Sequence, residues 1–312
     1  MHILITGANG FIGKHLVHRL LNNPGDLNVS RLTVMDLALE QIPDHKLIHK
    51  VEGSFNDGTL LSQALIEPAD LVFHLAAVPS GLAENNYALG VEVNIHGTMA
   101  LLEKLKDQGN CPSFVFASSI AVYGKPVTAE VTDDTLPTPN LSYGAQKVIA
   151  ETLVADYARR QWIKGCSVRL PGIVARPPEP NGAVSIFFSD LIRNLSSGLP
   201  FTCPISPDAR SWLMSVNLCV ENLLHAAALD FDQCRTWTLP AMHVSMDELV
   251  NAIDKIFPDK EVLSLIKFKK DSWVQENFGS YPPLHCSRAE AAGFHHDGNV
   301  KALVLNALAA ME

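Results

Sequence analysis

The sequence predicts an α/β protein built on a parallel, doubly wound sheet, and three observations support this prediction. Short apolar runs alternate with amphipathic helical patterns up to residue 171, each pair taking roughly thirty residues. The first run ends in a turn with glycines at positions 7, 10 and 13. With 312 residues, of which 47% are hydrophobic, the chain can form one large α/β unit or two unequal lobes.

The elements follow from the apolar pattern, taken in chain order. Uniformly apolar runs indicate strands that are buried on both faces, whereas apolar residues at helical spacing indicate helices packed on the sheet. The connection from Val78 to Asn85 is expected to be a loop. Strands are predicted at 2–5, 32–35, 46–51, 70–77, 112–119 and 165–170, and helices at 11–20, 60–66, 142–161 and in a long segment that ends near 108.

The pattern changes after position 171, where prolines at 171, 177, 178, 180, 200, 204 and 207 limit long regular elements. We expect a nucleotide-binding domain over residues 1–171, to which the chain returns around 211–240. Residues 172–210 and 241–312 are expected to form a smaller, discontinuous C-terminal lobe for the substrate. Its expected helices are 185–195, 246–257 and 299–311, and the returning segment is expected to contain a helix at 217–229 and a strand at 234–239.

The glycine turn carries the first functional signal. Gly7 allows the tight turn off the strand, Gly10 lets the backbone approach a pyrophosphate, and Gly13 lets helix and strand pack closely. The phosphates would then bind the free N–H groups at the positive end of the helix. A second apolar run ends in Asp36, about twenty residues beyond the turn, where a carboxylate holds an adenosine ribose.

The same carboxylate predicts which cofactor is preferred. A carboxylate accepts a hydrogen bond from the ribose 2′-OH of NAD and repels the 2′-phosphate of NADP. The residues that follow Asp36 are Leu37 and Ala38, so no arginine directly follows Asp36 to bind the 2′-phosphate of NADP. The sequence therefore predicts NAD.

The composition excludes other classes of partner. A formal net charge of −9 and the lack of a basic run argue against nucleic acid or an anionic membrane as partner. The six cysteines have no paired ligand spacing, and His295-His296-Asp297 is expected to be a solvated turn, so no metal is expected. No apolar run approaches the length of a membrane span, and no signal peptide is recognisable. We expect a cytoplasmic protein.

A tyrosine and a lysine mark the candidate chemistry. Tyr143 and Lys147 lie four residues apart at the start of a predicted helix, so both side chains share one face. A nearby cation favours the phenolate form of tyrosine, which makes it a usable base near neutral pH. The strand before this helix ends in Ser118 and Ser119, at the edge of the sheet where ligands bind in such folds. This trio suits removal of a proton from an alcohol while hydride leaves its carbon.

These motifs together resemble the extended short-chain dehydrogenase/reductase family, the NAD-dependent epimerases and dehydratases on a Rossmann-type fold. The resemblance covers roughly the first 175 residues and rests on motifs in the family's order. They are Thr6-Gly-x-x-Gly-x-x-Gly13, His74-Leu-Ala-Ala77, Val93-Asn94-x-x-Gly97-Thr98, Ser118-Ser119-x-x-Val122-Tyr123-Gly124 and Tyr143-x-x-x-Lys147.

The resemblance implies roles for individual residues. It implies Tyr143 as general base and acid, Lys147 as its electrostatic partner and a ribose ligand, and Ser119 on the reacting oxygen. Asn94 would belong to a supporting polar network. Contacts with the cofactor are implied for Asn9, Phe11, Ile12, Leu75, Ala76, Ala77, Asn94, Ser118, Tyr143, Lys147, Leu170 and Ile173.

The second half narrows the expected substrate. The segment 208–216 resembles the segment of sugar-nucleotide epimerases whose arginine binds the diphosphate of the substrate. Those enzymes also have an asparagine after the sixth strand, and in this sequence Gly172 stands at that position. The runs Ala77–Glu84 and Arg169–Pro177 resemble a branch that oxidises the four-carbon sugar acid D-erythronate at C2. On this reading Arg210 or Arg176 would bind the carboxylate through two hydrogen bonds. Ser80 and Ser185 are further candidates for substrate contacts, beside Ser119 and Tyr143.

The sequence therefore predicts an NAD-dependent dehydrogenase for a small sugar acid. One alternative is an epimerase or dehydratase of nucleotide sugars, which needs the same fold and the same tyrosine–lysine pair. An alternative of another class is a dinucleotide-sensing protein without catalysis, which has no use for an intact set of Tyr143, Lys147 and Ser119. Relatives often dimerise through the helices that contain Asn94 and Tyr143, so a homodimer is expected by analogy.

Overall fold

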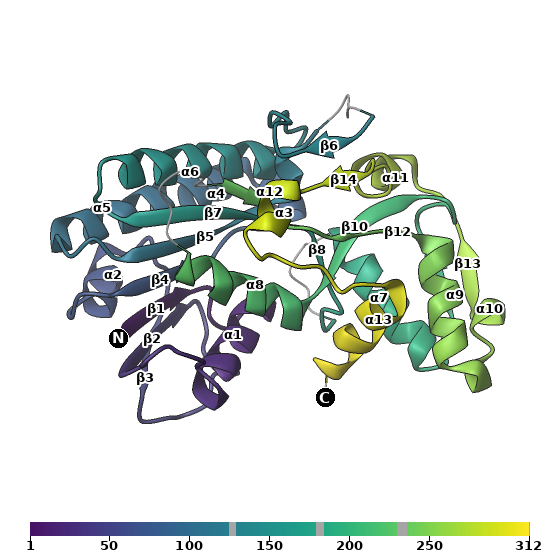
Figure 1. Ribbon diagram of the computed structural model, residues 1–312, viewed down its shortest axis with the longest axis horizontal. Helices are drawn as coiled ribbons and strands as arrows, with labels where there is room; N and C mark the ends of the chain where they lie inside the picture. The colour runs from purple at the N-terminus through teal and green to yellow at the C-terminus, as the bar shows by residue number, and fades with distance from the viewer. Residues whose placement is uncertain (125–128, 179–183, 230–235, 312) are drawn as a thin grey trace. The chain divides into compact units, whose positions relative to one another are not determined.

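The computed structural model describes residues 1–124, 129–178, 184–229 and 236–311, and the chain divides into two compact units (Figure 1). The first unit comprises Met1–Val122, Pro139–Arg169 and Leu223–Trp237. The second comprises Tyr123–Thr138, Leu170–Asn222 and Thr238–Glu312. The chain thus leaves the first unit after Val122 and again after Arg169, and it returns to this unit at Pro139 and at Leu223.

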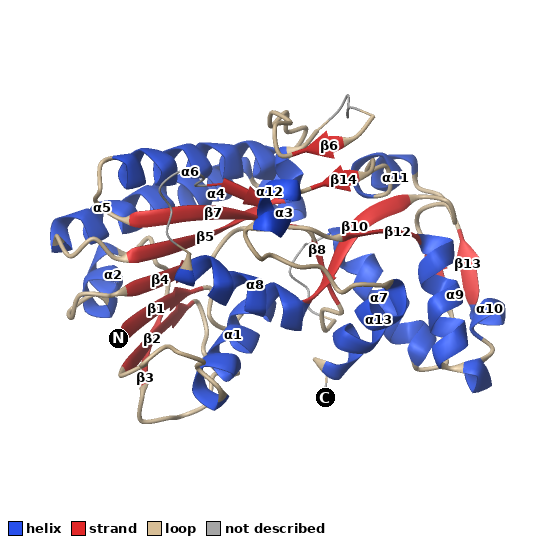
Figure 2. Ribbon diagram, in the orientation of Figure 1, coloured by secondary structure: helices blue, strands red, loops and turns tan. Residues whose placement is uncertain are grey.

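A seven-stranded sheet organises the first unit, with the order β11-β7-β5-β4-β1-β2-β3 (Figure 2). Strand β1 pairs in parallel with both β2 and β4, so the strand order reverses beside β1 and creates the switch point at which such sheets bind ligands. The predicted α/β class with a doubly wound parallel sheet is confirmed. The strands are β1 (His2–Thr6), β2 (Arg31–Asp36), β3 (Ile48–Glu52), β4 (Leu71–His74), β5 (Ser113–Ser119), β7 (Lys164–Leu170) and β11 (Thr236–Thr238).

Helices α2, α5 and α6 pack on this sheet through apolar side chains. One buried cluster joins Leu4 of β1 and Phe116 of β5 to leucines of α5 and to Val154 of α6. Alternate side chains of a strand point to opposite faces, so Ile3 and Ile5 are buried on the other face. The helices are α1 (Phe11–Asn22), α2 (Gly58–Ala64), α3 (Ser80–Asn85), α4 (Tyr87–Val91), α5 (Thr98–Gln108) and α6 (Ser142–Arg159), with the π-helical segment η1 (Glu92–Gly97) and the short 3₁₀ turn η2 (Ile120–Val122). Helix α8 (Val216–Ala228) begins in the second unit, and its residues from Leu223 onward belong to the first.

Two sequence expectations for this unit were wrong. The segment after β4 contains the short helix α3 instead of a loop, and its Glu84 carboxylate accepts a hydrogen bond from the backbone N–H of Ser142 at the start of α6 (2.9 Å). Six residues that include a glycine are too few to show helical periodicity. The long helix before residue 108 is divided, because the π-helical segment η1 separates α4 from α5.

The second unit contains short strands and helices, as expected of a proline-rich segment. Its sheets have the orders β12-β10-β8, β13-β9 and β14-β6. The strands are β6 (Val131–Thr132), β8 (Gly172–Val174), β9 (Phe201–Cys203), β10 (Arg210–Ser215), β12 (Met242–Ser245), β13 (Ile266–Phe268) and β14 (Leu284–His285). The helices are η3 (Val184–Ile186), α7 (Phe187–Ser196), α9 (Met246–Ile256), η4 (Pro258–Lys260), α10 (Val262–Leu265), α11 (Ser272–Phe278), α12 (Ser287–Ala291) and α13 (Val300–Ala309).

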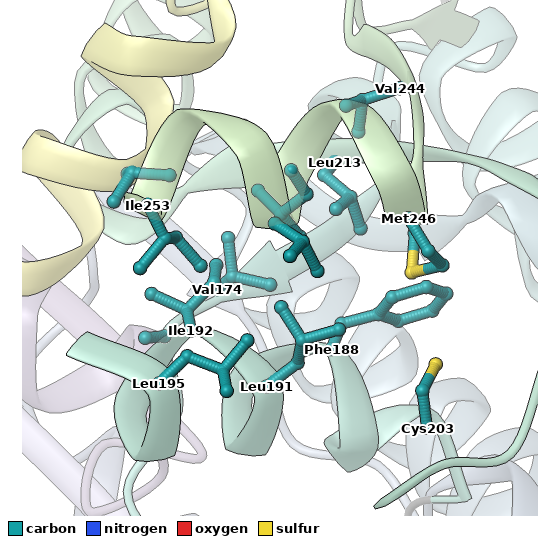
Figure 3. Close-up of a cluster of buried hydrophobic side chains, with 14 of the residues drawn as sticks. Val174, Phe188, Leu191, Ile192, Leu195, Cys203, Leu213, Val244, Met246 and Ile253 are labelled. Atoms are coloured by element: carbon teal, nitrogen blue, oxygen red, sulfur yellow. The ribbon is translucent and has the colours of Figure 1, made fainter. Parts of the chain in front are cut away.

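This second unit has its own hydrophobic core. Side chains of α7 and α9 point toward one another, with Phe188 and Ile192 from one helix and Met246 and Ile253 from the other (Figure 3). Leu213 of β10 lies in the same cluster. Helix α9 begins with a capping box, in which the Ser245 hydroxyl accepts from the N–H of Glu248.

The predicted solvated turn at 295–297 was wrong for its last residue. Asp297 is buried, and its carboxylate accepts hydrogen bonds from the backbone N–H (3.0 Å) and the hydroxyl (2.6 Å) of Ser215, the last residue of β10. It also accepts from the Asn306 amide (2.9 Å).

No helix among the described residues has both the length and the hydropathy needed to cross a bilayer.

Candidate active site

The turn after β1 is built around close backbone contacts. Gly7 has a φ of +73°, and a Cβ added there would lie 2.6 Å from the backbone nitrogen of Ala76. A Cβ on Gly13 would lie 2.1 Å from the carbonyl oxygen of Gly7, so only glycine lets α1 pack on the end of β1. A Cβ on Gly10 would meet a single protein atom, the same carbonyl oxygen, at 3.3 Å. Two of the glycines are therefore required by the fold, whereas Gly10 leaves open a cradle that fits a pyrophosphate.

Asp36 lies at the end of β2 with both carboxylate oxygens held by backbone groups. The N–H of Asn9 donates to Oδ2 (2.9 Å) and the N–H of Leu37 donates to Oδ1 (2.8 Å). Burial raises the pKa of this carboxyl group above its usual range, while the backbone hydrogen bonds oppose the rise. The Asn9 side chain in turn accepts from the backbone N–H of Gln41 (3.1 Å). These contacts fix both carboxylate oxygens of Asp36 at the end of β2, where the sequence predicts a contact with the adenosine ribose.

A buried histidine links the strands beneath this turn. His74 lies between the hydroxyl of Thr6, 2.6 Å from Nδ1, and that of Thr98, 2.9 Å from Nε2. Because the Thr98 hydroxyl donates to the carbonyl of Asn94 (2.9 Å), Nε2–H donates to Thr98, and Nδ1 accepts from Thr6. Burial lowers the pKa of His74 to about 3, so the ring is neutral. This chain of hydrogen bonds joins β1, β4 and α5 at the edge where the cofactor turn begins.

Asn94 lies in the π-helical segment η1 and is buried. Its amide binds the backbone of Val78 twice, accepting from N–H at 2.8 Å and donating to the carbonyl at 3.1 Å, and it donates to Oε1 of Gln146 at 2.7 Å. Segments of π-helix often occur at functional sites. The contacts of Asn94 anchor the segment after β4 to α6, which is a supporting role.

Tyr143 and Lys147 lie on α6 as their spacing predicts. The Lys147 ammonium lies 5.5 Å from the centroid of the Tyr143 ring and 4.5 Å from that of Phe116, and it donates to the carbonyl of Ala117 (2.7 Å). Burial lowers the pKa of Lys147 to about 7, whereas the charge of Glu151 opposes this shift. The structure thus places a buried amine, with a pKa close to neutrality, beside the tyrosine.

Ser119 ends β5, and its hydroxyl accepts from the backbone N–H of Ala121 (3.1 Å). The first turn of α6 packs against the backbone just beyond Ser119, because a Cβ on Gly144 would lie 2.1 Å from the carbonyl oxygen of Ala121. Gly144 therefore allows the segment that follows Ser119 to approach the helix that carries Tyr143. The three predicted catalytic residues belong to the same unit and to neighbouring elements.

The remaining candidates are divided between the units. Ser80 begins α3 in the first unit, while Arg176, Ser185, Arg210, Leu170 and Ile173 belong to the second unit. The Arg210 guanidinium already binds a carboxylate, with Nη1 3.1 Å and Nη2 3.0 Å from the two oxygens of Glu248. Arg176 accepts a hydrogen bond at its carbonyl from Arg193 (2.7 Å).

Several residues of this site were missed by the sequence analysis. Gly144 and Gln146 lie inside the tyrosine–lysine motif, yet the motif itself assigns them no role. Glu151 also belongs to the site, since it lies one helical turn beyond Lys147 and is buried. The spacing of four residues from Lys147 to Glu151 repeats the spacing from Tyr143 to Lys147, so the sequence already indicated that Glu151 lies on the same helix face.

The glycine turn, the acid that ends β2 and the pairing of Tyr143 with the buried Lys147 indicate an NAD-dependent oxidoreductase. The model of the NAD dependent epimerase/dehydratase family matches residues 3–228, and the chain belongs to this family. The resemblance to extended short-chain dehydrogenases/reductases, the prediction of an enzyme and the prediction of NAD as its cofactor are confirmed.

Two relatives match over almost their whole length. The chain is 36% identical to a D-erythronate dehydrogenase of Cupriavidus necator, covering 96% of this chain and 95% of the relative. It is 32% identical to a D-erythronate dehydrogenase of Haemophilus influenzae, covering 97% and 98%. Among solved structures, a nucleoside-diphosphate-sugar epimerase of Agrobacterium tumefaciens superposes with a TM-score of 0.88 at 31% identity, covering 97% of this chain and 92% of that chain.

Proposed function

We propose that this enzyme oxidises a small sugar acid, D-erythronate, at C2 to the 2-oxo acid and passes hydride to NAD. The observation that carries the catalytic part is the buried Lys147 beside Tyr143. The full-length similarity to two D-erythronate dehydrogenases supports the substrate. When bound, NAD supplies the hydride acceptor.

The residues of the chain would supply binding and proton transfer. The turn at Gly10 and the carboxylate of Asp36 would hold the pyrophosphate and the adenosine ribose. The Lys147 ammonium would favour the phenolate of Tyr143, which takes the proton of the C2 hydroxyl as the C2–H bond breaks. Ser119 would donate a hydrogen bond to the same oxygen. The products are then the 2-oxo acid, protonated Tyr143 and NADH, so atoms and electrons balance.

Gly172 favours an acid over a nucleotide sugar. It begins β8, and a Cβ there would lie 2.9 Å from Cδ2 of Leu213 and 3.2 Å from the carbonyl oxygen of Trp212 on the neighbouring β10. An asparagine would crowd this strand pair. The chain therefore lacks a donor that the resemblance leads us to expect in nucleotide-sugar enzymes, and the smaller anion is the better fit.

The alternative is an epimerase acting on a nucleotide sugar, and the solved epimerase at 31% identity favours it. A panel of four- to six-carbon aldonic and uronic acids with NAD, read as reduced nicotinamide over time, tests the proposal. UDP- and GDP-sugars are titrated in parallel by calorimetry. Oxidation of D-erythronate without nucleotide-sugar binding is expected. Micromolar binding of a nucleotide sugar, with no acid oxidised, would replace the dehydrogenase by the epimerase.

Arg210 is proposed to bind the substrate carboxylate, with Arg176 as the second candidate. Since the Glu248 carboxylate already binds the Arg210 guanidinium, the carboxylate of the substrate must displace it. Arg210→Lys keeps the charge but loses the planar fork, so KM for the acid should rise roughly tenfold while NAD affinity stays unchanged. Glu248→Gln should lower KM, because it frees the fork. Arg288→Lys is the control, since Arg288 also pairs with carboxylates in the second unit. Unchanged KM in both Arg210→Lys and Glu248→Gln would leave Arg176 as the candidate.

Asp36→Ala is expected to narrow the preference for NAD over NADP. The variant loses an acceptor for the ribose and a charge that repels the 2′-phosphate, so kcat/KM with NAD should fall roughly tenfold while that with NADP rises. Steady-state kinetics with both cofactors measure the ratio. Asp44→Ala, which removes an exposed carboxylate paired with Lys50, should leave the ratio unchanged. Equal efficiency with both cofactors in the unmodified enzyme would contradict the role of Asp36.

We further propose a homodimer that forms through the first unit. Large apolar side chains are exposed on helices α4, α5 and α6. They are Tyr87 and Leu89 on α4, Met99 on α5 and Ile149 on α6, the helix that carries Tyr143 and Lys147. Exposed apolar clusters of this kind often mark protein–protein interfaces. Sedimentation velocity should give the mass of two chains. A reducing compartment such as the cytoplasm is the proposed location, because the cysteines of the described residues, at 111, 166, 203, 219 and 286, are thiols rather than disulfides.

A further inference from the structure

A buried ion pair continues the line of catalytic residues along α6. Glu151 is 6% exposed, and it faces Arg169 of β7, which is 8% exposed. The guanidinium donates from Nε to Oε1 (2.9 Å) and from Nη2 to Oε2 (2.8 Å). The hydroxyl of Ser118 donates to Oε1 at 2.5 Å. Both carboxylate oxygens are therefore held in place from two neighbouring strands.

The register of α6 relates this pair to the chemistry. Tyr143, Lys147 and Glu151 follow one another at intervals of four residues, so they occupy one face of the helix. Lys147 donates to the carbonyl of Ala117, and Glu151 accepts from Ser118. Two successive turns of α6 thus bind the two residues of β5 that directly precede Ser119.

The charges around Lys147 come from few groups. On its own helix it faces Tyr143 and Glu151; β7 contributes Arg169, and β4 contributes His74, which is neutral. The contacts that Lys147 makes with β5 are uncharged, being the Phe116 ring and the Ala117 carbonyl. The buried amides of Asn94 on η1 and Gln146 on α6, which bind one another, are also uncharged. Glu151 is therefore the anion that opposes loss of the proton from this buried ammonium.

We propose that Glu151 is a positioning residue that acts through Lys147. Its carboxylate, fixed by Arg169 and Ser118, holds the Lys147 ammonium in its charged form beneath the ring of Tyr143. The importance of this effect for catalysis rests on the proposed role of Tyr143 as the base. On this proposal Glu151 acts from its buried position between Arg169 and Ser118 and does not itself bind substrate or cofactor.

Removing the Glu151 carboxylate would change the protonation of Lys147 and, through it, that of Tyr143. Burial already brings the pKa of Lys147 down to about 7, and the charge of Glu151 opposes that shift. Without the carboxylate the ammonium would lose its proton at a lower pH. Tyr143 would then lack its nearby cation, its phenolate would be less favourable, and the pH at which the base becomes available would rise.

A merely structural ion pair predicts a different result. Buried ion pairs are often replaced by apolar side chains without loss of stability, so the pair is weak evidence for a stabilising role. A structural role would change the unfolding temperature and leave the titration of Tyr143 unaltered. A positioning role changes the titration, whatever happens to the stability.

The test compares Glu151→Gln, which removes the charge at constant size, with Glu151→Asp, which keeps the charge. The phenolate of Tyr143 is followed by ultraviolet absorbance against pH, as the difference between each protein and its Tyr143→Phe counterpart. Glu151→Gln should move the midpoint upward by about one pH unit, and the acid limb of kcat/KM should move with it. Glu151→Asp should retain the original midpoint. Glu103→Gln on α5, where the carboxylate accepts from Tyr157, is the control without a shift.

The double variant Glu151→Met with Arg169→Met covers the case that Glu151→Gln does not fold. It removes the carboxylate together with its cationic partner, so it should move the midpoint in the same upward direction but by less than Glu151→Gln does. An unchanged Tyr143 midpoint in the charge-removing variant that folds overturns the proposal. Because the absorbance titration needs no substrate, this result is separate from a failure of the proposed dehydrogenase, which would appear as no acid oxidised by the unmodified protein.

Discussion

Tyr143→Phe is expected to lower the rate of substrate oxidation by roughly 10²–10⁴, the contribution of a general base. The change removes one oxygen and leaves the ring beside the Lys147 ammonium, so the fold and NAD binding should survive. Single-turnover formation of NADH, together with thermal unfolding and NAD titration, separates loss of chemistry from loss of structure.

The matched control for this variant lies on the same helix. Tyr157→Phe removes a hydroxyl that binds Glu103, and it should cost about 1 kcal/mol of stability while the rate stays unchanged. Near-normal turnover of Tyr143→Phe would rule out Tyr143 as the base. The assignment of Lys147 and Glu151 as its supporting groups would then lose its chemical basis.

Gly13→Ala is expected to damage the fold and the cofactor site together. The added methyl group would lie 2.1 Å from the carbonyl oxygen of Gly7 and 2.8 Å from Cα of Ala8, so α1 must move away from β1. Overpacking of this kind costs roughly 1–3 kcal/mol or more, and the displaced helix N-terminus should weaken NAD by at least about tenfold. Chemical denaturation and calorimetric titration of NAD measure the two effects.

Gly10→Ala is expected to weaken NAD binding without the loss of stability expected for Gly13→Ala. Gly10 has a φ of −69°, which any residue adopts, and its nearest protein atom would be 3.3 Å from the new methyl group. Stability should therefore remain close to that of the unmodified protein, whereas NAD affinity should fall because the methyl group fills the cradle. Gly58→Ala is the control, since a Cβ there meets no atom within 4 Å. Tight NAD binding by both Gly10→Ala and Gly13→Ala would contradict the placement of the pyrophosphate.

The first half of the fold was predictable because its signals are local. Each buried strand of the first unit is a short apolar run, and the turn after β1 needs glycine for backbone reasons that hold in any such unit. The spacing of Tyr143 and Lys147 places them on one helix face through the helical period alone. The second unit was harder to predict, because its strands are two to six residues long and pair with distant segments, as β10 does with β8 and β12.

The sequence by itself determined the parallel α/β class, the glycine turn with Asp36, and the pairing of Tyr143 with Lys147, because these depend on residues close together in the chain. Only the tertiary structure decided which charges meet. Glu248 lies 38 residues beyond Arg210 and occupies its guanidinium, and Arg169 reaches from β7 to hold Glu151 beside Lys147. A charge acts through space and through burial, and neither the distance between two side chains nor the loss of water around them can be read from their separation along the chain.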